Sequence, residues 1–352
     1  MLPMYVIRYI IFPFLVTVLS SVVLTYLVRR LTQTIGLLDK PGQHKQHEAP
    51  TPTLGGVSVF LSFLIGCGLC GPLSPQLHLV LYTATGLVLV GLLDDLVGVS
   101  ANLKLSALGI AAWFLWKYGI HLDVFGSTGI FALVLTFLWI GLVSSAFNGV
   151  DNADGAAGGL ACISCVTTFA ISWVTWQHDL AVVSLVLAAA CIGFLVFNYP
   201  RPRASIFLGD SGSLFLGFGL SVLAILGQWS EIGWKSAVIG FALVLVPLAD
   251  FCFILISRGL DGRYRRWDDP IKMCARDHTF HRLRALGLSN QAALWLMYAM
   301  ASLYGVLAYL TVTRPEVATA FRIAQWLGPI GLFYLALYQV HLPDDAFPKR
   351  ES

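Results

Sequence analysis

The chain has 352 residues, of which 57% are hydrophobic and only 12% are charged. Because soluble domains contain about 25% charged residues, this composition excludes an ordinary soluble protein and indicates an integral membrane protein. The formal net charge of +3 is too small to indicate a nucleic-acid-binding protein.

About eleven apolar segments follow one another along the chain, and each is expected to be a helix because backbone polar groups must be hydrogen-bonded inside lipid. They cover residues of about 9–28, 54–71, 77–93, 104–118, 130–147, 157–176, 180–197, 212–228, 236–256, 290–311 and 320–341. Those at 77–93 and 104–118 are short for full spans. Runs such as Leu243-Val-Leu-Val246 do not alternate as barrel strands do. We therefore predict an all-α membrane protein of about eleven spans, folded as one domain over residues 1–352.

The distribution of basic residues predicts the orientation, since cytoplasmic loops carry an excess of lysine and arginine. One side of the predicted membrane holds 17 of the 22 lysines and arginines. With an odd number of spans, this places the N-terminus outside and the C-terminus in the cytoplasm. The first segment lacks the basic start and the cleavage site of a signal peptide, so we expect it to remain as a span. The longest polar stretch, 257–289, is then a cytoplasmic loop.

Asp94 and Asp95 end the third apolar segment on the predicted cytoplasmic side. Neighbouring positions of a helix point about 100° apart, so the two carboxylates can serve different partners. One can hold a metal ion while the other handles a proton or positions a phosphate. The structural alternative is solvation of the helix end with a salt bridge to Lys104.

The segment Asn148-Gly-Val-Asp151-Asn-Ala-Asp154-Gly155 carries a polar side chain at every third position. If the segment is helical, Asn148, Asp151 and Asp154 lie on one face. Their oxygen atoms suit a hard cation such as Mg²⁺, and Gly155 allows a ligand to approach the backbone closely. The structural alternative is an ordinary polar helix start.

Gly209-Asp210-Ser-Gly-Ser213 precedes a long apolar segment. Asp210 is either the cap of this helix or a metal ligand beside a helix N-terminus that accepts phosphate. Asn198 lies just upstream, where a nucleotide can find hydrogen-bond partners. The nearby Arg201 and Arg203 either contact that nucleotide or only contribute to the excess of basic residues on the cytoplasmic side.

His278 and His281 lie three residues apart in the basic loop at 257–289. They are either solvated or contact a diphosphate and transfer protons. Arg276, Arg282 and Arg284 favour an anionic ligand, with lipid head groups as the alternative. Asp250, near the end of a span, is expected to be structural or a minor site residue.

Together these motifs resemble the polyprenyl-phosphate N-acetylhexosamine-1-phosphate transferases, and most closely the branch that uses UDP-N-acetylglucosamine. The resemblance runs from about residue 35 to 290 in the family's motif order, and extends to an eleven-span layout. The family's aspartate pair falls on Asp94 and Asp95, and its Asn-x-x-Asp-Gly-x-Asp-Gly segment begins at Asn148, with Asn152 in place of a glycine. Its His-x-His-His loop is here His278-Thr-Phe-His281. Phe280 thus replaces one histidine, which bears on how the loop grips a diphosphate.

The resemblance implies a reaction in which a UDP-amino sugar and a polyprenyl phosphate give polyprenyl-diphospho-sugar and UMP. It implies Mg²⁺, or Mn²⁺ in its place, held by Asp210 and Asp151. It also implies catalytic roles for Asp94, Asp95, Asp151, His278 and His281, and substrate contacts for Asn148, Asp154, Asn198, Lys104 and Arg282. The division of roles between Asp94 and Asp95 stays open.

The expected setting is a bacterial inner membrane, as a first membrane step of cell-surface polysaccharide synthesis, with a homodimer as the family's assembly. The rival hypothesis is a transporter or flippase for an anionic lipid or solute. Transporters place ionisable groups near the middle of the bilayer. Here the acidic residues gather on one predicted face, which favours the enzyme.

Overall fold

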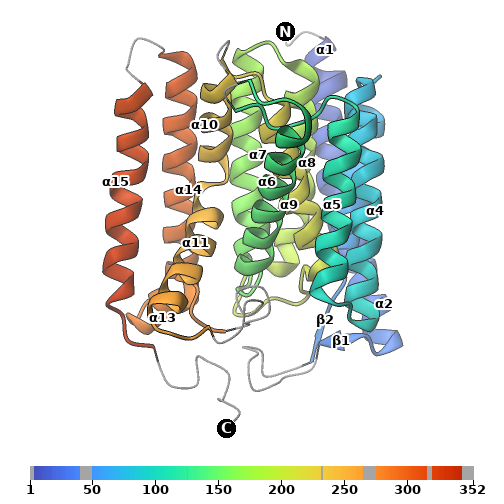
Figure 1. Cartoon of the computed structure of the whole chain (residues 1–352). Coiled ribbons are helices and arrows are strands. Elements are labelled where there is room, and N and C mark those ends of the chain that lie inside the picture. The colour runs from blue at the N-terminus through green and yellow to red at the C-terminus, as the bar shows by residue number, and fades with distance from the viewer. Residues whose placement is uncertain are drawn as a thin grey trace.

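The computed structural model describes residues 4–39, 50–124, 126–230, 233–264, 275–314 and 319–342. Its helices run side by side as a bundle (Figure 1). Each of the expected apolar segments is helical in the structure. The helices are α1 Met4–Val6 with a π-helical turn at Ile7–Ile11, α2 Phe12–Ile35, α3 Gly55–Leu69, α4 Pro75–Val97, α5 Ala101–Lys117, α6 Gly129–Val150, α7 Ala156–Val174, α8 His178–Asn198, α9 Gly209–Leu226, α10 Gly233–Leu243, α11 Leu245–Leu260, α13 Thr279–Ala285, α14 Asn290–Thr313 and α15 Thr319–Tyr338.

Seven helices in the described ranges are long and apolar enough to cross a membrane, or eight if α10 and α11 form one bent span. α3 has 15 residues and α5 has 17, which is short for a span. α4 has 23 residues, so the segment predicted at 77–93 is longer than expected. The structure fits an all-α membrane protein with several spans, while the count of eleven and the orientation stay predictions.

A two-stranded hairpin is the one β element in the described part of the chain. β1 (Leu38–Asp39) pairs antiparallel with β2 (Thr51–Pro52), with Leu38 opposite Pro52. Both strands lie at the same end of the bundle as α13, at the bottom of Figure 1. We call this end the polar end.

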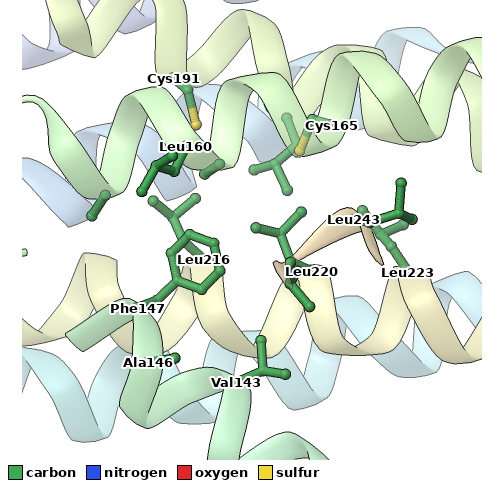
Figure 2. Close-up of a cluster of buried hydrophobic side chains, with 14 of the residues drawn as sticks. Val143, Ala146, Phe147, Leu160, Cys165, Cys191, Leu216, Leu220, Leu223 and Leu243 are labelled. Carbon is green, nitrogen blue, oxygen red and sulfur yellow. The ribbon is translucent and has the colours of Figure 1, made fainter. Parts of the chain in front are cut away.

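α9 lies in the core, between α6 on one side and α7 on the other. Figure 2 shows Phe147 of α6, Leu160 of α7 and Leu216 of α9 in one buried apolar cluster. The buried thiols of Cys165 and Cys191 pack in the same cluster as small apolar groups. This packing fixes the position of α9, and therefore of the polar residues at its start.

Glycines let α3 and α4 approach the start of α9 at backbone contact. A Cβ atom at Gly56 of α3 would lie 2.1 Å from the Gly212 nitrogen, and one at Gly91 of α4 would lie 2.5 Å from Ser211 Cα. Small residues at helix contacts allow such approach inside membranes, where packing drives helix association. The close approach brings the end of α4 beside the start of α9.

Replacing Gly56 by alanine is expected to destabilise the fold by about 1–3 kcal/mol, because the added methyl meets backbone atoms that cannot move aside. The measurement is the thermal unfolding midpoint of the protein in detergent. Gly68→Ala is the matched control on the same helix, since a Cβ atom there has nothing within 4 Å. Equal midpoints for the two variants would contradict this packing.

The apolar segment predicted at 236–256 is not one straight helix. α10 and α11 meet at an angle of 81°. Pro247 has no N–H to donate to the carbonyl of Leu243, four residues earlier. The Ser164 hydroxyl of α7 donates to that carbonyl instead, at 2.6 Å, which satisfies a backbone group that lipid would leave unpaired.

Candidate active site

A cavity of about 1390 Å³ opens at the polar end of the bundle. Its lining comes from α2, β1, β2, α4, α5, α6, α8, α9, α11, α13 and α14, and from the turns at 151–154 and 203–207. The predicted site residues among its lining are Asp94, Asp95, Lys104, Asn148, Asp151, Asp154, Asn198, Asp210, His278 and His281. Of the predicted set, Arg282 alone is not part of this lining.

The two neighbouring carboxylates of α4 have different partners. Asp94 accepts a hydrogen bond from the Val99 N–H at 2.6 Å and forms an ion pair with Lys104, whose Nζ lies 2.6 Å from Oδ2. Asp95 accepts from the Asp210 N–H at 2.7 Å and from the Ser211 N–H at 3.1 Å. Asp95 therefore caps the start of α9, while Asp94 and Lys104 form a charged pair at the cavity wall.

Asp210 joins three elements at this wall. Its Oδ1 accepts from Lys104 Nζ at 3.1 Å and from Asn148 Nδ2 at 2.8 Å. Asn148 also donates to the Ser213 hydroxyl at 3.0 Å. Asp210 is thus not a conventional side-chain cap of its own helix, the alternative left open by the sequence. Its carboxylate is held at the cavity by the ends of α5 and α6.

Asp151 and Asp154 do not continue the helix that carries Asn148, contrary to the periodicity argument. α6 ends at Val150, and residues 151–154 form turns before α7. The carboxylates nevertheless reach the cavity. Withdrawal from water and the charges of Asp210, Asp95 and Asp154 raise the pKa of Asp151 well above its ordinary value. Several acidic groups therefore crowd this point of the wall, where a nearby cation would favour their ionised forms.

Asn198 and Asp154 brace the backbone around the cavity. The buried Asn198 amide accepts from the Gly155 N–H at 2.9 Å and donates to the Ile206 carbonyl at 2.9 Å. Asp154 accepts from the Ala204 N–H at 2.8 Å. These bonds tie the start of α7 to the segment before α9. Direct contacts of both residues with a substrate stay predictions.

His278, just before α13, and His281, in α13, both line the cavity, and Phe280 does not. Phe280 is buried in the apolar core, edge-on to the His281 ring. The departure from the family's histidine pattern therefore leaves the lining of the cavity to His278 and His281. Withdrawal from water and the neighbouring His278 lower the pKa of His281 to about 4, so His281 is neutral near pH 7.

Arg282, predicted to contact substrate, points elsewhere. Its guanidinium donates to the backbone carbonyls of Asp277 and Leu337 at 3.1 Å, and lies 4.9 Å from the Phe253 ring centre. It fixes α13 to the end of α15. The buried Arg258, which sequence reasoning did not single out, does line the cavity and pairs with Asp277 through two bonds of 2.7 Å.

Asp250 of α11 contacts a histidine of the cavity lining, which the sequence did not reveal. It is fully buried, and its Oδ2 lies 2.7 Å from Nδ1 of His278. The signal in the sequence was a carboxylate inside an apolar segment, which is costly unless a partner fixes it. The partner lies 28 residues away in the chain, so no local pattern reveals the pair.

The described residues contain no group of three or more histidine, cysteine or acidic side chains arranged to hold a metal alone. Mg²⁺ commonly takes only one or two protein carboxylates and completes its shell with water and substrate phosphates. Asp94, Asp95, Asp151 and Asp210 share the cavity with the single amine of Lys104. Both oxygens of Asp95 accept from backbone N–H groups, and those of Asp94 accept from Val99 and Lys104. Lys104 and Asn148 both bind the same oxygen of Asp210, its Oδ1, so Asp210 and Asp151 are the oxygen donors that fit such an ion best.

Comparison with known proteins adds independent information. Residues 77–228 match the family model described as glycosyl transferase family 4. The chain is 32% identical over 310 residues to a Bacillus subtilis protein named probable undecaprenyl-phosphate N-acetylglucosaminyl 1-phosphate transferase, covering 85% of this chain and 84% of the relative. It is 32% identical over 329 residues to a putative glycosyltransferase of Streptomyces coelicolor, covering 91% of this chain and 75% of the relative.

A third relative, from Escherichia coli strain K12, is named undecaprenyl-phosphate alpha-N-acetylglucosaminyl 1-phosphate transferase. It is 29% identical over 314 residues, covering 85% of this chain and 83% of the relative. The family-model match at 77–228 contains Asp94, Asp95, Asp151, Asp154 and Asp210 of the cavity wall but not His278 and His281. The alignments with the relatives are about twice as long as that match.

Proposed function

The chain belongs to glycosyl transferase family 4, and from this premise we propose that it transfers a sugar-1-phosphate from a UDP-amino sugar to undecaprenyl phosphate, with release of UMP. The names of its relatives favour N-acetylglucosamine as the sugar. The observation that carries the proposal is the cavity in which Asp94, Lys104 and Asp210 meet at a membrane-protein surface. Diphosphate chemistry needs such a mixture of acidic and basic groups.

In the proposed reaction, an oxygen of the lipid phosphate attacks the sugar-bearing β-phosphorus of the UDP-sugar. A new P–O bond forms, the bond from that phosphorus to the bridging oxygen breaks, and UMP leaves with the electron pair. Asp94 is the carboxylate that orients the lipid phosphate or takes its proton, because one of its oxygens is held by the Lys104 side chain, which a phosphate can also bind. Both oxygens of Asp95 instead accept from backbone N–H groups that fix the start of α9. Lys104 stands beside Asp94 to bind phosphate oxygens.

A magnesium ion held by Asp210 and Asp151 would neutralise the diphosphate and stabilise charge on the leaving group. Asn148 keeps the Asp210 carboxylate oriented toward the cavity. His278, just before α13, and His281, in α13, line the same cavity, with His281 as a neutral hydrogen-bonding group. Positioning and charge stabilisation then account for most of the rate enhancement.

The cavity at one end of the bundle favours the enzyme over the transporter, whose ionisable groups are expected near the middle of the membrane. With the orientation predicted from the basic residues, the polar end faces the cytoplasm of a bacterial inner membrane. There a soluble UDP-sugar and a membrane lipid meet at one surface. The reaction is a first membrane step of cell-surface polysaccharide synthesis.

The test is UMP release by the purified protein in detergent, with undecaprenyl phosphate and a panel of UDP-sugars, with and without Mg²⁺. We expect release that requires the lipid phosphate and the metal, and that is fastest with UDP-N-acetylglucosamine. UMP release that is fastest with a different UDP-amino sugar would change only the identity of the donor and leave the proposed reaction in place. A folded protein that releases no UMP from any donor would contradict the proposed function.

A further inference from the structure

We propose that Asp250 is a positioning residue of this site: its carboxylate holds the proton of His278 on Nδ1 and directs Nε2 into the cavity. This proposal rests on the proposed function for its effect on rate. The orientation of His278 itself is a property of the resting protein. Asp250 lies on α11, and His278 lies just before α13.

Two hydrogen bonds define the role of Asp250. Its Oδ2 lies 2.7 Å from His278 Nδ1, and its Oδ1 accepts from the Thr279 N–H at 2.6 Å. An aspartic acid is a much stronger acid than an imidazolium ion, so the proton between Asp250 and His278 resides on the imidazole and Asp250 is the ionised acceptor of both bonds. The partner nitrogen of His278 must then carry a proton, whether the ring is neutral or cationic.

The surroundings of His278 leave one nitrogen for chemistry. The ring is 7% exposed and lines the cavity. Nε2 has no hydrogen-bond partner among the described residues, whereas Nδ1 is taken by Asp250. The Cε1 edge of the ring lies against α6, where a Cβ atom added to Gly149 would be only 3.0 Å away. His278 therefore lies beside Gly149 at the end of α6. Gly149 directly follows Asn148 in the sequence.

The same carboxylate also sets the angle at which α13 enters the site. Asp250 Oδ1 binds the first N–H of α13, and the Thr279 hydroxyl is 3.1 Å from the Tyr334 hydroxyl of α15. Arg258 lies about two turns after Asp250 on α11. It donates to Asp277, the residue just before His278. α11 thus holds the residues on either side of His278: the Asp250 carboxylate binds Thr279 and the Arg258 guanidinium binds Asp277.

With its proton fixed on Nδ1, neutral His278 offers Nε2 as an acceptor toward the cavity. In the cationic form Nε2–H donates to a phosphate oxygen. Both forms suit a group that meets a diphosphate. The opposite tautomer, with the proton on Nε2 and Nδ1 facing Asp250, would place a lone pair against a carboxylate. That repulsion rotates the ring away from its position.

Asp250→Asn is the decisive variant, because asparagine has the same shape but only one acceptor for two donors. If its oxygen stays with Thr279, its NH₂ group faces Nδ1 and forces the wrong tautomer. We expect kcat to fall by on the order of 10²- to 10⁴-fold, the range known for such a tautomer change elsewhere. KM is expected to change by less than about threefold, since the loss is in the reacting complex.

The tautomer is read directly from ¹⁵N NMR of histidine-labelled protein in detergent without substrate, with the His278 signal assigned by its absence from His278→Gln. We expect a protonated Nδ1 in the wild-type protein and its loss in Asp250→Asn. Tyr334→Phe is the matched control: it removes another buried hydrogen bond at the start of α13. This variant is expected to keep Nδ1 protonated and to change kcat by less than about threefold.

A wild-type proton on Nε2 with Nδ1 unprotonated would overturn the proposal, and so would an Asp250→Asn variant with wild-type kcat. If that variant does not fold, the wild-type spectrum alone decides. Absence of UMP release by the wild-type protein would count against the proposed function instead. The spectrum, which needs no substrate, keeps the two outcomes apart.

Discussion

Replacing Asp210 by asparagine is expected to lower kcat by on the order of 10³-fold while the protein stays folded. Asp210 Oδ1 accepts from both Lys104 and Asn148, and an amide cannot supply the charge that those contacts and a bound cation require. Folding should not suffer, since the variant also removes one negative charge from a crowded acidic wall. The measurements are steady-state UMP release over a range of Mg²⁺ concentrations and the thermal midpoint.

Asp179→Asn is the control for this variant. Asp179 is an exposed carboxylate in the first turn of α8, another helix of the bundle, and lies outside the cavity lining. We expect wild-type kcat and an unchanged metal requirement for this protein. Wild-type turnover by Asp210→Asn at every Mg²⁺ concentration would show that Asp210 is not part of the reaction centre.

Replacing Asp95 by alanine is expected to reduce both stability and activity. The change leaves the N–H groups of Asp210 and Ser211 without their acceptors, which costs about 1–2 kcal/mol as for other lost helix caps. Because the same N–H groups fix the first turn of α9, the Asp210 carboxylate loses its position. We expect at least about a hundredfold loss of kcat, since small misplacements of catalytic groups have such effects.

The control for the loss of a helix cap alone lies at the other end of α4, the helix that carries Asp95. Ser74 caps the start of α4 through a bond to the Leu77 N–H. Ser74→Ala should lower the thermal midpoint by a comparable amount and leave UMP release unchanged. If Asp95→Ala behaves like Ser74→Ala in both assays, Asp95 is only a cap and does not position the site.

Much of the fold follows from apolar segments alone. Residues such as Phe147, Leu160 and Leu216 lie in long uninterrupted apolar runs, and lipid leaves a helix as the only way to satisfy their backbone. The gathering of Asp94, Asn148, Asp210 and His278 at one end of the bundle also followed from the sequence. Asp94, Asn148 and Asp210 lie next to the ends of apolar segments, and the segment order brings those ends together. His278 lies in the polar loop at 257–289, which is predicted on the same side.

Other features needed the three-dimensional contacts. The bend before Pro247 depends on Ser164 of another helix, which satisfies the freed carbonyl. Asp94 and Asp95 have different partners because the start of α9 meets only one of them. The place of Asp250 in the site is visible only from its contact with His278, which is distant in the sequence. Such pairings depend on helix packing, which periodicity and motif spacing do not specify.

Arg282 is a residue that the motif wrongly indicated as part of the cavity lining. A basic residue beside two histidines suggested an anion contact, yet its guanidinium donates to backbone carbonyls at the end of α15. Arginine carries several donors and commonly satisfies backbone groups in this way. The sequence of a charged loop does not distinguish a side chain that binds substrate from one that holds the loop together.

The central claim, that phosphate moves together with the sugar, is tested most directly by a doubly labelled donor. UDP-N-acetylglucosamine labelled in the sugar and at the β-phosphorus is incubated with the purified protein, undecaprenyl phosphate and Mg²⁺. We predict that both labels enter the lipid fraction in equal amounts while UMP appears in the aqueous phase. Sugar label in the lipid without the phosphorus label, with UDP released, would contradict the account.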